Sequence, residues 1–199
     1  TKLSNMAKEH ELTGLEFSYG IPGTVGGAMV MNAGAYDGEM SFVVESVTML
    51  DENLNVKTFT NEEMKFSYRH SILKEKSFIV LATTFKLAAG NRKEIEDKMN
   101  DFMERRRSKQ PLEFPSAGST FKRPTGYFAG KLIQDAGLSG KRVGGACVSP
   151  KHCGFVVNDL NGTAKDVSDL MDLVVREVKE KYDVVLEPEV IKLINYHIK

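Results

Sequence analysis

Four short stretches of the sequence contain residues whose side chains or backbone amides could bind a ligand or take part in catalysis. The first, residues 20–36 (GIPGTVGGAMVMNAGAY), places four glycines within eight positions. An ordered glycine costs about 0.5–1 kcal/mol relative to alanine, so this density indicates either positive φ angles or close approach of a ligand. Exposed backbone amides could hold an anionic or flat ligand. Tight turns between core elements would explain the same spacing, and spacing alone leaves both interpretations open.

The glycine run matches neither of two common nucleotide-binding motifs. A dinucleotide-binding fingerprint needs G-x-G-x-x-G, whereas the spacing here is Gly20, Gly23, Gly26 and Gly27. A P-loop needs a lysine and a hydroxyl residue after the last glycine, and none follows. Residues 137–142 (GLSGKR) also lack the P-loop pattern, so we interpret them as a turn that ends a helix.

The other three stretches offer side chains. Residues 66–71 (FSYRHS) contain an arginine that could bind an anion or form a surface ion pair. Residues 117–124 (AGSTFKRP) place a serine before two cations, without the G-x-S-x-G of α/β-hydrolases, and could equally be a solvated turn. In residues 186–190 (LEPEV), Glu187 and Glu189 would share one face of an extended strand, either solvated or directed into a cleft.

Hydrophobic periodicity predicts the elements that must position these groups. In the first half of the chain we expect a hairpin over 42–60, a short helix over 61–66 capped by Asn61, a buried strand over 77–90 and an amphipathic helix over 92–109. The proline at 111 ends this helix.

In the second half, residues 111–130 read as a loop, followed by a short helix over 128–136. Two short strands around a turn are expected within 142–159, then an amphipathic helix over 164–182. A final strand over 184–194 is broken by a proline. Helices and strands mix without a regular βαβ repeat, so the fold class predicted is α+β.

Composition excludes several functions. The chain has 199 residues, 27 basic and 27 acidic, so its formal net charge of zero gives no reason to expect a nucleic-acid partner. No apolar run reaches about 18 residues, so we expect no membrane span. Cys147 and Cys153 fit no zinc signature, so no metal is expected. Two isolated cysteines favour a reducing, cytoplasmic compartment, and no protein partner is inferred.

The order of the stretches is more specific than any one of them. GIPGTVGGAMVMNAGAY, SYRHS, PSAGSTFKRP, YFAGKLIQDAGLSGKRVGG, KHCGFVVN and LEPEV follow one another from about residue 14 to 194. Together they resemble the UDP-N-acetylenolpyruvoylglucosamine reductases, the flavoenzymes that complete UDP-N-acetylmuramate for bacterial peptidoglycan.

The resemblance implies an architecture. Residues 1–100 would be the second half of an FAD-binding domain of the vanillyl-alcohol-oxidase type, and 101–199 a C-terminal α+β substrate-binding domain. The family's first FAD-binding segment has no counterpart here. The longer insertion after the strand at 77–87, which one branch carries, is also missing, so the chain resembles the shorter, second type.

The resemblance also implies a reaction and its catalytic residues. NADPH reduces FAD, and the reduced flavin gives a hydride to the enolpyruvyl group of the UDP-sugar substrate. Arg69 would bind the substrate carboxylate and stabilise the enolate that develops, Glu189 would act at the enolate, and Ser119 would donate the proton.

Other positions match family contacts. His152 and Arg123 stand where the longer branch carries amides. The cofactor contacts implied are Gly20, Ile21, Pro22, Gly23, Thr24, Gly26, Gly27, Asn32, Ala33, Gly34, Tyr68 and Arg106, and the substrate contacts are Lys109, Arg123 and His152.

Two alternatives differ in class. The chain could be another FAD-dependent oxidoreductase on the same scaffold, which would explain the glycines but not Ser119 and Glu189 in one ordered pattern. It could also be a non-catalytic binding fragment. Because only one wall of the FAD site is expected here, we expect the chain alone to fold, to bind FAD weakly or not at all and to be inactive.

Overall fold

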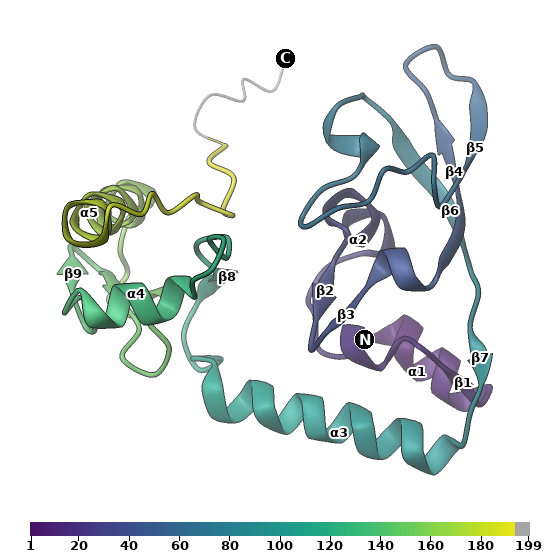
Figure 1. Ribbon diagram of the computed structural model, residues 1–199, viewed down its shortest axis with the longest axis horizontal. Helices are drawn as coiled ribbons and strands as arrows, with labels where there is room; N and C mark the ends of the chain where they lie inside the picture. The colour runs from purple at the N-terminus through teal and green to yellow at the C-terminus, as the bar shows by residue number, and fades with distance from the viewer. Residues whose placement is uncertain (194–199) are drawn as a thin grey trace. The chain divides into compact units, whose positions relative to one another are not determined.

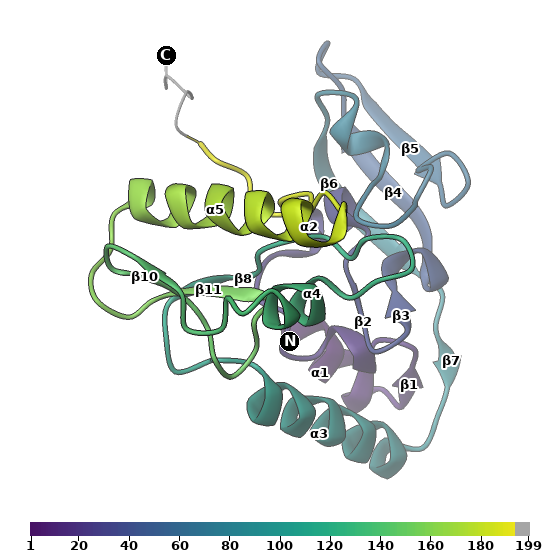
Figure 2. The same ribbon diagram turned by 60° about the vertical axis from the view of Figure 1, so that its left-hand side comes forward.

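The computed structural model describes residues 1–193 and has an α+β fold, as predicted (Figures 1 and 2). The chain divides into two compact units, Thr1–Arg105 and Arg106 onward, each with its own buried hydrophobic cluster. The sequence boundary was expected between residues 100 and 101; the structure divides within helix α3 (Arg92–Lys109).

Unit 1 contains a three-stranded antiparallel sheet of order β5-β4-β6, with two small two-stranded sheets, β1-β7 and β2-β3. Met29, Val47 and Met49 are fully buried in its core. Its elements are α1 (Lys2–Glu9), β1 (Leu12–Thr13), η1 (Glu16–Ser18), α2 (Val25–Met31), β2 (Gly34–Ala35), β3 (Gly38–Glu39), η2 (Met40–Phe42), β4 (Val44–Leu50), β5 (Val56–Thr60), η3 (Ile72–Lys74), β6 (Ile79–Phe85) and β7 (Ala88–Ala89).

The hairpin predicted over 42–60 is confirmed as β4 and β5. Asp51 shapes its turn, because Oδ1 accepts hydrogen bonds from the backbone N–H groups of Asn53 and Asn55, each at 2.9 Å. Lys57 Nζ lies 2.7 Å from Asp51 Oδ2. Aspartate commonly forms such turns through its own backbone neighbours.

Two expectations for unit 1 are wrong. Residues 61–65 form turns rather than a helix, and Asn61 Nδ2 donates to Ser41 O and Val44 O, at 2.8 and 2.7 Å. The strand within 77–90 exists as β6, but it is not buried. Among the described strands it pairs only with β4, and Ile79 and Leu81 are 63% and 52% exposed. Helix α2 lies within the glycine run, for which tight turns were one of the two interpretations left open.

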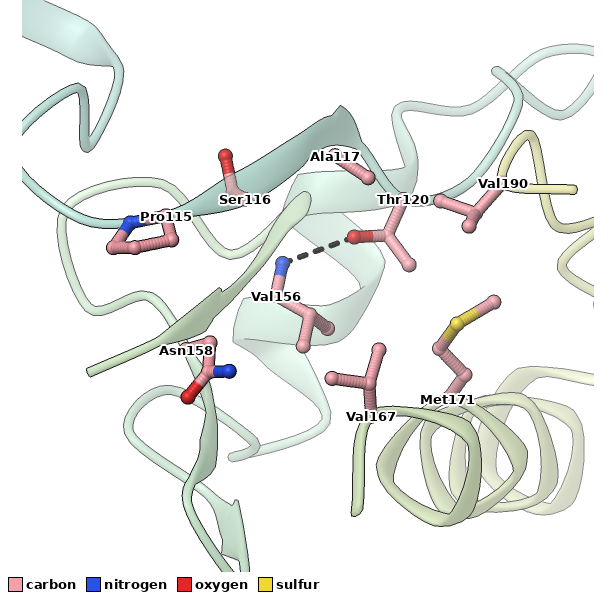
Figure 3. A pocket seen from close by; sticks show the side chains of 9 residues that line it. All are labelled: Pro115, Ser116, Ala117, Thr120, Val156, Asn158, Val167, Met171 and Val190. Atoms are coloured by element: carbon pink, nitrogen blue, oxygen red, sulfur yellow. Dashed lines mark hydrogen bonds between the residues drawn. The ribbon is translucent and has the colours of Figure 1, made fainter. Parts of the chain in front are cut away.

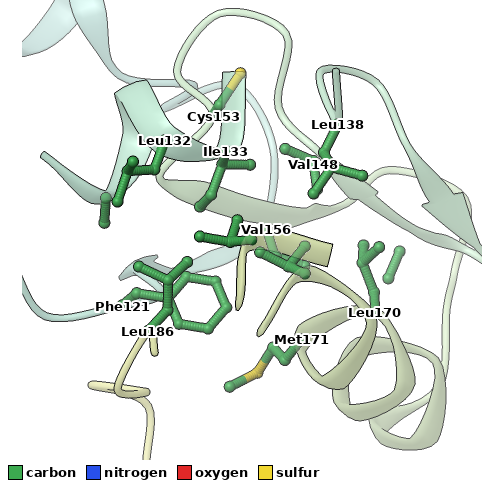
Figure 4. Close-up of a cluster of buried hydrophobic side chains, with 14 residues drawn as sticks. Phe121, Leu132, Ile133, Leu138, Val148, Cys153, Val156, Leu170, Met171 and Leu186 are labelled. Atoms are coloured by element: carbon green, nitrogen blue, oxygen red, sulfur yellow. The ribbon is translucent and has the colours of Figure 1, made fainter. Parts of the chain in front are cut away.

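Unit 2 is built on a four-stranded antiparallel sheet of order β8-β11-β10-β9. Figure 4 shows side chains from the strands, from α4 and from α5 gathered in one core, to which Leu186 and Phe121 also contribute. The elements after α3 are β8 (Ser116–Ser119), α4 (Ala129–Asp135), β9 (Arg142–Val143), β10 (Ala146–Val148), β11 (Phe155–Asn158) and α5 (Ala164–Tyr182).

The helices predicted over 92–109, 128–136 and 164–182 are confirmed as α3, α4 and α5. Helix α5 begins with a capping box, in which the Thr163 side chain accepts from Asp166 N and the Asp166 carboxylate accepts from Thr163 N.

The strand predictions for unit 2 were less complete. Residues 142–159 form three strands, since β9 adds to the two expected, and β8 lies in the supposed loop. The final strand over 184–194 is wrong for the described residues, where a single antiparallel bridge joins Pro188 to Phe121. Residue 194 lies outside the described part of the chain.

Candidate functional site

The glycine run forms a loop, then helix α2, then the β2-β3 hairpin. Thr24 caps α2, because its Oγ1 accepts a hydrogen bond from Gly27 N at 3.1 Å. The first amides of a helix have no partner within the helix. The loop before α2 is solvent-accessible: Pro22, Gly23 and Thr24 are exposed and Ile21 is half-buried.

The glycines of this run differ in what a side chain would meet. At Gly23, φ is +130° and an added Cβ would have no protein atom within 4 Å. At Gly26 and Gly27 the nearest atoms would lie at ordinary contact distances, 3.5 and 3.4 Å. At Gly34, by contrast, a Cβ would be 2.7 Å from Gly38 O within the hairpin. Packing of the protein therefore requires Gly34, whereas the space beside Gly23 is open and side chains at Gly26 and Gly27 would make only ordinary contacts.

Asn32 ends helix α2 with a left-handed backbone, at φ +42°. Its residue surface is 1% exposed. The Nδ2 atom donates to Ser67 O at 3.1 Å, and Oδ1 accepts from Ser41 N at 2.9 Å. The structure thus gives Asn32 two backbone partners, one of them in the stretch that carries Arg69. Its neighbours Ala33 and Gly34 are half-buried.

Tyr68 and Arg69 form the tip of a tight turn. Ser67 and His70 exchange both of their backbone hydrogen bonds, each at 3.1 Å. Arg69 has φ +55°, a left-handed conformation that costs a residue with a Cβ about 1–2 kcal/mol. Its guanidinium lies 5.0 Å from the centre of the exposed Tyr68 ring. Strained residues of this kind cluster at functional sites, so the turn is a candidate binding element.

In unit 2, Ser119 stands exposed at the end of β8, directly after Gly118, whose φ is +81°. Ser119 pairs with Phe155 of β11, and cross-strand partners point to the same face of a sheet. The His152 ring contacts the Phe155 ring edge to face, with centroids 5.0 Å apart. Ser119 and the His152–Phe155 ring pair therefore belong to one face of the sheet.

The segment that carries Glu189 runs alongside the end of β8. Glu189 N donates to Thr120 O at 2.9 Å, and Lys122 N donates to Glu187 O at 2.9 Å. Lys122 also forms an ion pair with the exposed Glu187 carboxylate. Two stretches far apart in the sequence, one with Ser119 and one with Glu189, are thus brought together by backbone pairing.

His152 is half-buried and held in one orientation. Its Nδ1 accepts a hydrogen bond from Gly154 N at 3.1 Å, which leaves Nε2 to carry the proton of the neutral ring. A Cβ on Gly130 would lie 3.1 Å from His152 Cε1, so α4 contacts the ring closely. Burial lowers the pKa of His152, and the positive charge of Lys109 lowers it further. The imidazole is therefore held in its neutral form.

The remaining predicted contacts lie in or near unit 2. The Arg123 guanidinium stacks on Phe128, 4.0 Å from its ring centre. Lys109 is exposed in the last turn of α3, where Arg106 is buried. Among the predicted residues, backbone pairing sets the segments of Ser119 and Glu189 side by side in unit 2, and in unit 1 a hydrogen bond links Asn32 to the turn of Tyr68 and Arg69.

Figure 3 shows a pocket of about 310 Å³ between β8, β11 and α5 that the sequence did not reveal. Its only drawn hydrogen bond joins Val156 N to Thr120 Oγ1, at 2.9 Å. Two lining residues, Thr120 and Val190, directly follow Ser119 and Glu189. The lining is mostly apolar: Pro115, Ser116, Ala117, Thr120, Val156, Asn158, Val167, Met171 and Val190. Because these residues belong to several elements, no single motif could signal the pocket.

Within residues 1–193, no three histidine, cysteine, aspartate or glutamate side chains gather so as to hold a metal ion. Cys147 and Cys153 are both buried and unpaired with one another. Of the helices in the described part of the chain, none combines the length and apolar character needed to cross a membrane.

These features define an α+β protein with an exposed glycine-rich loop in one unit and, in the other, an exposed serine and a half-buried histidine that are both associated with Phe155. The UDP-N-acetylenolpyruvoylglucosamine reductase C-terminal domain family model matches residues 110–193. The crystal structure of UDP-N-acetylenolpyruvylglucosamine reductase from Thermus caldophilus superimposes with a TM-score of 0.83 at 38% identity, covering 96% of this chain and 69% of that one. The chain therefore belongs to the UDP-N-acetylenolpyruvoylglucosamine reductase family.

Curated relatives bear the same name. Those from Caldanaerobacter subterraneus subsp. tengcongensis and Clostridium perfringens strain SM101 are 58% and 55% identical to the chain over 188 residues. Each alignment covers 94% of this chain and 62% of the relative. The chain thus spans less than two thirds of the length of these relatives.

Proposed function

We propose that the protein reduces UDP-N-acetylglucosamine enolpyruvate to UDP-N-acetylmuramate, for peptidoglycan synthesis, with FAD and NADPH. The observation that carries the proposal is the pairing that sets the Glu189 segment beside Ser119, in a chain of this family. The two cysteines, free and buried, support a reducing cytoplasmic setting.

The glycine run fits a flat, anionic cofactor. A side chain at Gly23 would meet no protein atom, and at Gly26 and Gly27 only ordinary contacts, so packing does not require these three glycines; exposed amides there would suit a pyrophosphate. FAD, when bound, would supply hydride transfer from NADPH to the substrate. In this proposal unit 1 is the central FAD-binding part of a vanillyl-alcohol-oxidase-type domain. The residues that would hold FAD are Gly20, Ile21, Pro22, Gly23, Thr24, Gly26, Gly27, Ala33, Gly34, Tyr68 and Arg106, with Asn32 behind them.

Arg69 binds the substrate carboxylate and stabilises negative charge as the enolate develops. Its planar guanidinium offers two parallel donors, a geometry that a lysine ammonium cannot reproduce. The turn fixes the backbone of Arg69 at φ +55°, so the side chain leaves the chain in a set direction. Preorganised charge of this kind is the largest catalytic contribution in many enzymes.

Ser119 and Glu189 act on the carbon that receives the proton and on the enolate. Ser119 is exposed, and its hydroxyl donates the proton, a transfer that a carbanion-like intermediate is basic enough to accept. Glu189 acts at the enolate that forms next to this carbon. The neutral His152 ring, whose Nε2–H is a hydrogen-bond donor, contacts the UDP-sugar with Lys109 and Arg123.

The experiment that tests the function is an NADPH oxidation assay. The protein used is a polypeptide that spans the whole length of the curated relatives and carries this sequence. We expect oxidation of NADPH to depend on UDP-N-acetylglucosamine enolpyruvate and to yield UDP-N-acetylmuramate. Oxidation that proceeds equally without the UDP-sugar would indicate another flavin-dependent oxidoreductase instead, and the proposal would be abandoned.

A further inference from the structure

We propose that Asn32 is a positioning residue for Arg69, so that helix α2 couples the cofactor surface at its start to the carboxylate-binding arginine beyond its end. The inference rests on the proposed function for the role of Arg69. It assigns Asn32 a task behind the site, in place of direct contact with the cofactor.

The first observation is the link from Asn32 to the arginine turn. Asn32 Nδ2 donates to Ser67 O, the first residue of the turn whose tip is Tyr68 and Arg69. The other end of the amide, Oδ1, accepts from Ser41 N. With 1% of its surface exposed, Asn32 cannot exchange these partners for water, so losing one leaves a buried polar group unpaired.

A second contact ties the other end of the turn to the same helix. Ser71, which follows the turn and is fully buried, donates from Oγ to Val30 O at 3.0 Å. Ser71 Oγ also accepts from Leu73 N and so caps η3. Both ends of the strained turn are therefore fastened to the last turn of α2 and to the residue that ends it.

Helix α2 sets the distance between the glycine-rich loop and the turn that carries Arg69. It is seven residues long, about 10 Å at the usual rise per residue. Gly26 and Gly27 lie in its first turn, directly after the exposed loop of Pro22, Gly23 and Thr24, and Asn32 is its C-cap. One short rigid element thus separates the exposed glycine-rich loop from the turn that carries Arg69. A misplacement of about 1 Å can cost about 100-fold in rate, so such a spacer matters for the reaction.

The test compares Asn32→Asp with a matched control. Asn32→Asp keeps the acceptor for Ser41 N and loses the donor to Ser67 O. Asn61→Asp removes an amide donor in the same unit that binds Ser41 O and Val44 O and does not contact the arginine turn. Ser71→Ala provides a second route to the same turn if Asn32→Asp fails to fold.

The first measurement is amide hydrogen exchange in the 199-residue chain, which needs no cofactor. The amide of His70 donates to Ser67 O. We expect Asn32→Asp and Ser71→Ala each to raise its exchange rate at least about tenfold, because the turn opens locally more often. Asn61→Asp should leave it unchanged. Unchanged exchange in both test variants would overturn the link from α2 to the turn.

The second measurement uses a polypeptide spanning the length of the curated relatives. We expect Asn32→Asp to slow substrate-dependent flavin reoxidation by about 10–100-fold while FAD affinity and flavin reduction by NADPH hold. In an Arg69→Ala background the same change should cost nothing more, because Asn32 acts through Arg69. Equal losses in both backgrounds, or weakened FAD binding, would overturn the positioning role. If the unmodified protein shows no substrate-dependent activity, the proposed function is overturned. The hydrogen-exchange measurement does not depend on that activity, so the two failures can be told apart.

Discussion

Ser119 is the residue with the sharpest role in the proposed reaction. Ser119 is exposed at a strand end, and in the proposed reaction its hydroxyl acts only when the substrate carbon is protonated. Ser119→Ala should therefore leave flavin reduction by NADPH intact and slow reoxidation by the enolpyruvyl substrate about 10²–10⁴-fold, the usual contribution of general acid catalysis. Stopped-flow absorbance of the flavin separates the two half-reactions. Reoxidation at the unmodified rate would remove Ser119 from the mechanism.

Arg69 combines a function with a backbone cost. Arg69→Gly removes the left-handed penalty but adds glycine entropy, so the free energy of unfolding should stay within about 1 kcal/mol. Substrate-dependent reoxidation should nonetheless be lost. Urea unfolding and reoxidation rates measure the two effects.

Arg69→Lys should be nearly as damaging to reoxidation as Arg69→Gly, since an ammonium cannot make a two-pronged carboxylate contact. If lysine restores most of the activity, Arg69 contributes only a point charge.

For single residues, the sequence indicated which positions could belong to a functional site but not which side chains contact one another. Glu187 and Glu189 were expected to share one face of an extended strand, but no strand forms at these described residues: Leu186 is buried and Glu187 exposed, whereas Pro188 is also exposed and Glu189 is half-buried. The buried position of Asn32 was not foreseeable, because its partners Ser67 and Ser41 are contributed by other elements. Long-range pairing of this kind leaves no local pattern in the sequence.

Among the elements, the β4-β5 hairpin contains a carboxyl group that titrates unusually. The Lys57 ammonium beside Asp51, with the backbone N–H of Asn55, lowers the pKa of that carboxyl from 3.8 to about 2. A carboxyl whose folded pKa is depressed stabilises the fold above its unfolded pKa, and that contribution is lost as pH falls from about 4 towards 2. Asp51→Asn keeps the acceptor for Asn53 and Asn55 but cannot titrate.

We therefore expect the urea midpoint of Asp51→Asn to depend less on pH than that of the unmodified chain between pH 4 and 2. Circular dichroism during urea titrations at a series of pH values measures this midpoint. Identical pH profiles for the two proteins would show that the hairpin turn does not depend on the charge of Asp51.

Elements that carry their own pattern could be predicted, and those that depend on neighbours could not. Helix α5 has apolar residues at helical spacing and a cap at Thr163, and it was foreseen to the residue. Helix α2 contains two adjacent glycines, which disfavour a helix, so it depends on the Thr24 cap and on burial of Met29. Strand β8 contains a glycine and exposed small residues, and only β11 makes it a strand.

For the whole molecule, the two hydrophobic clusters and the exposed glycine-rich loop lead to different expectations. Each unit has its own core, so the 199-residue chain should fold. Ligand sites usually bury 70–90% or more of a small molecule, whereas the loop of Pro22, Gly23 and Thr24 is exposed. The relatives also extend well beyond the matched part.

We therefore expect this chain alone to bind FAD weakly or not at all and to lack reductase activity. The check is to add excess FAD, desalt the protein and read the flavin absorbance, with a polypeptide of the relatives' full length as the control. A stoichiometrically loaded 199-residue chain that reduces the enolpyruvyl substrate would refute this expectation.

The exposed apolar side of β6 has a consequence for handling the protein. Among the described strands β6 has one neighbour, and Ile79 and Leu81 stand 63% and 52% exposed on it. An unprotected edge strand of this kind recruits other chains, so the protein should self-associate as its concentration rises. Light scattering of a dilution series should show growing particles, and Leu81→Lys should suppress them, while Lys86→Leu, a change beyond the end of β6, should not. If the Leu81→Lys protein scatters light as strongly as the unmodified chain, self-association occurs through another surface.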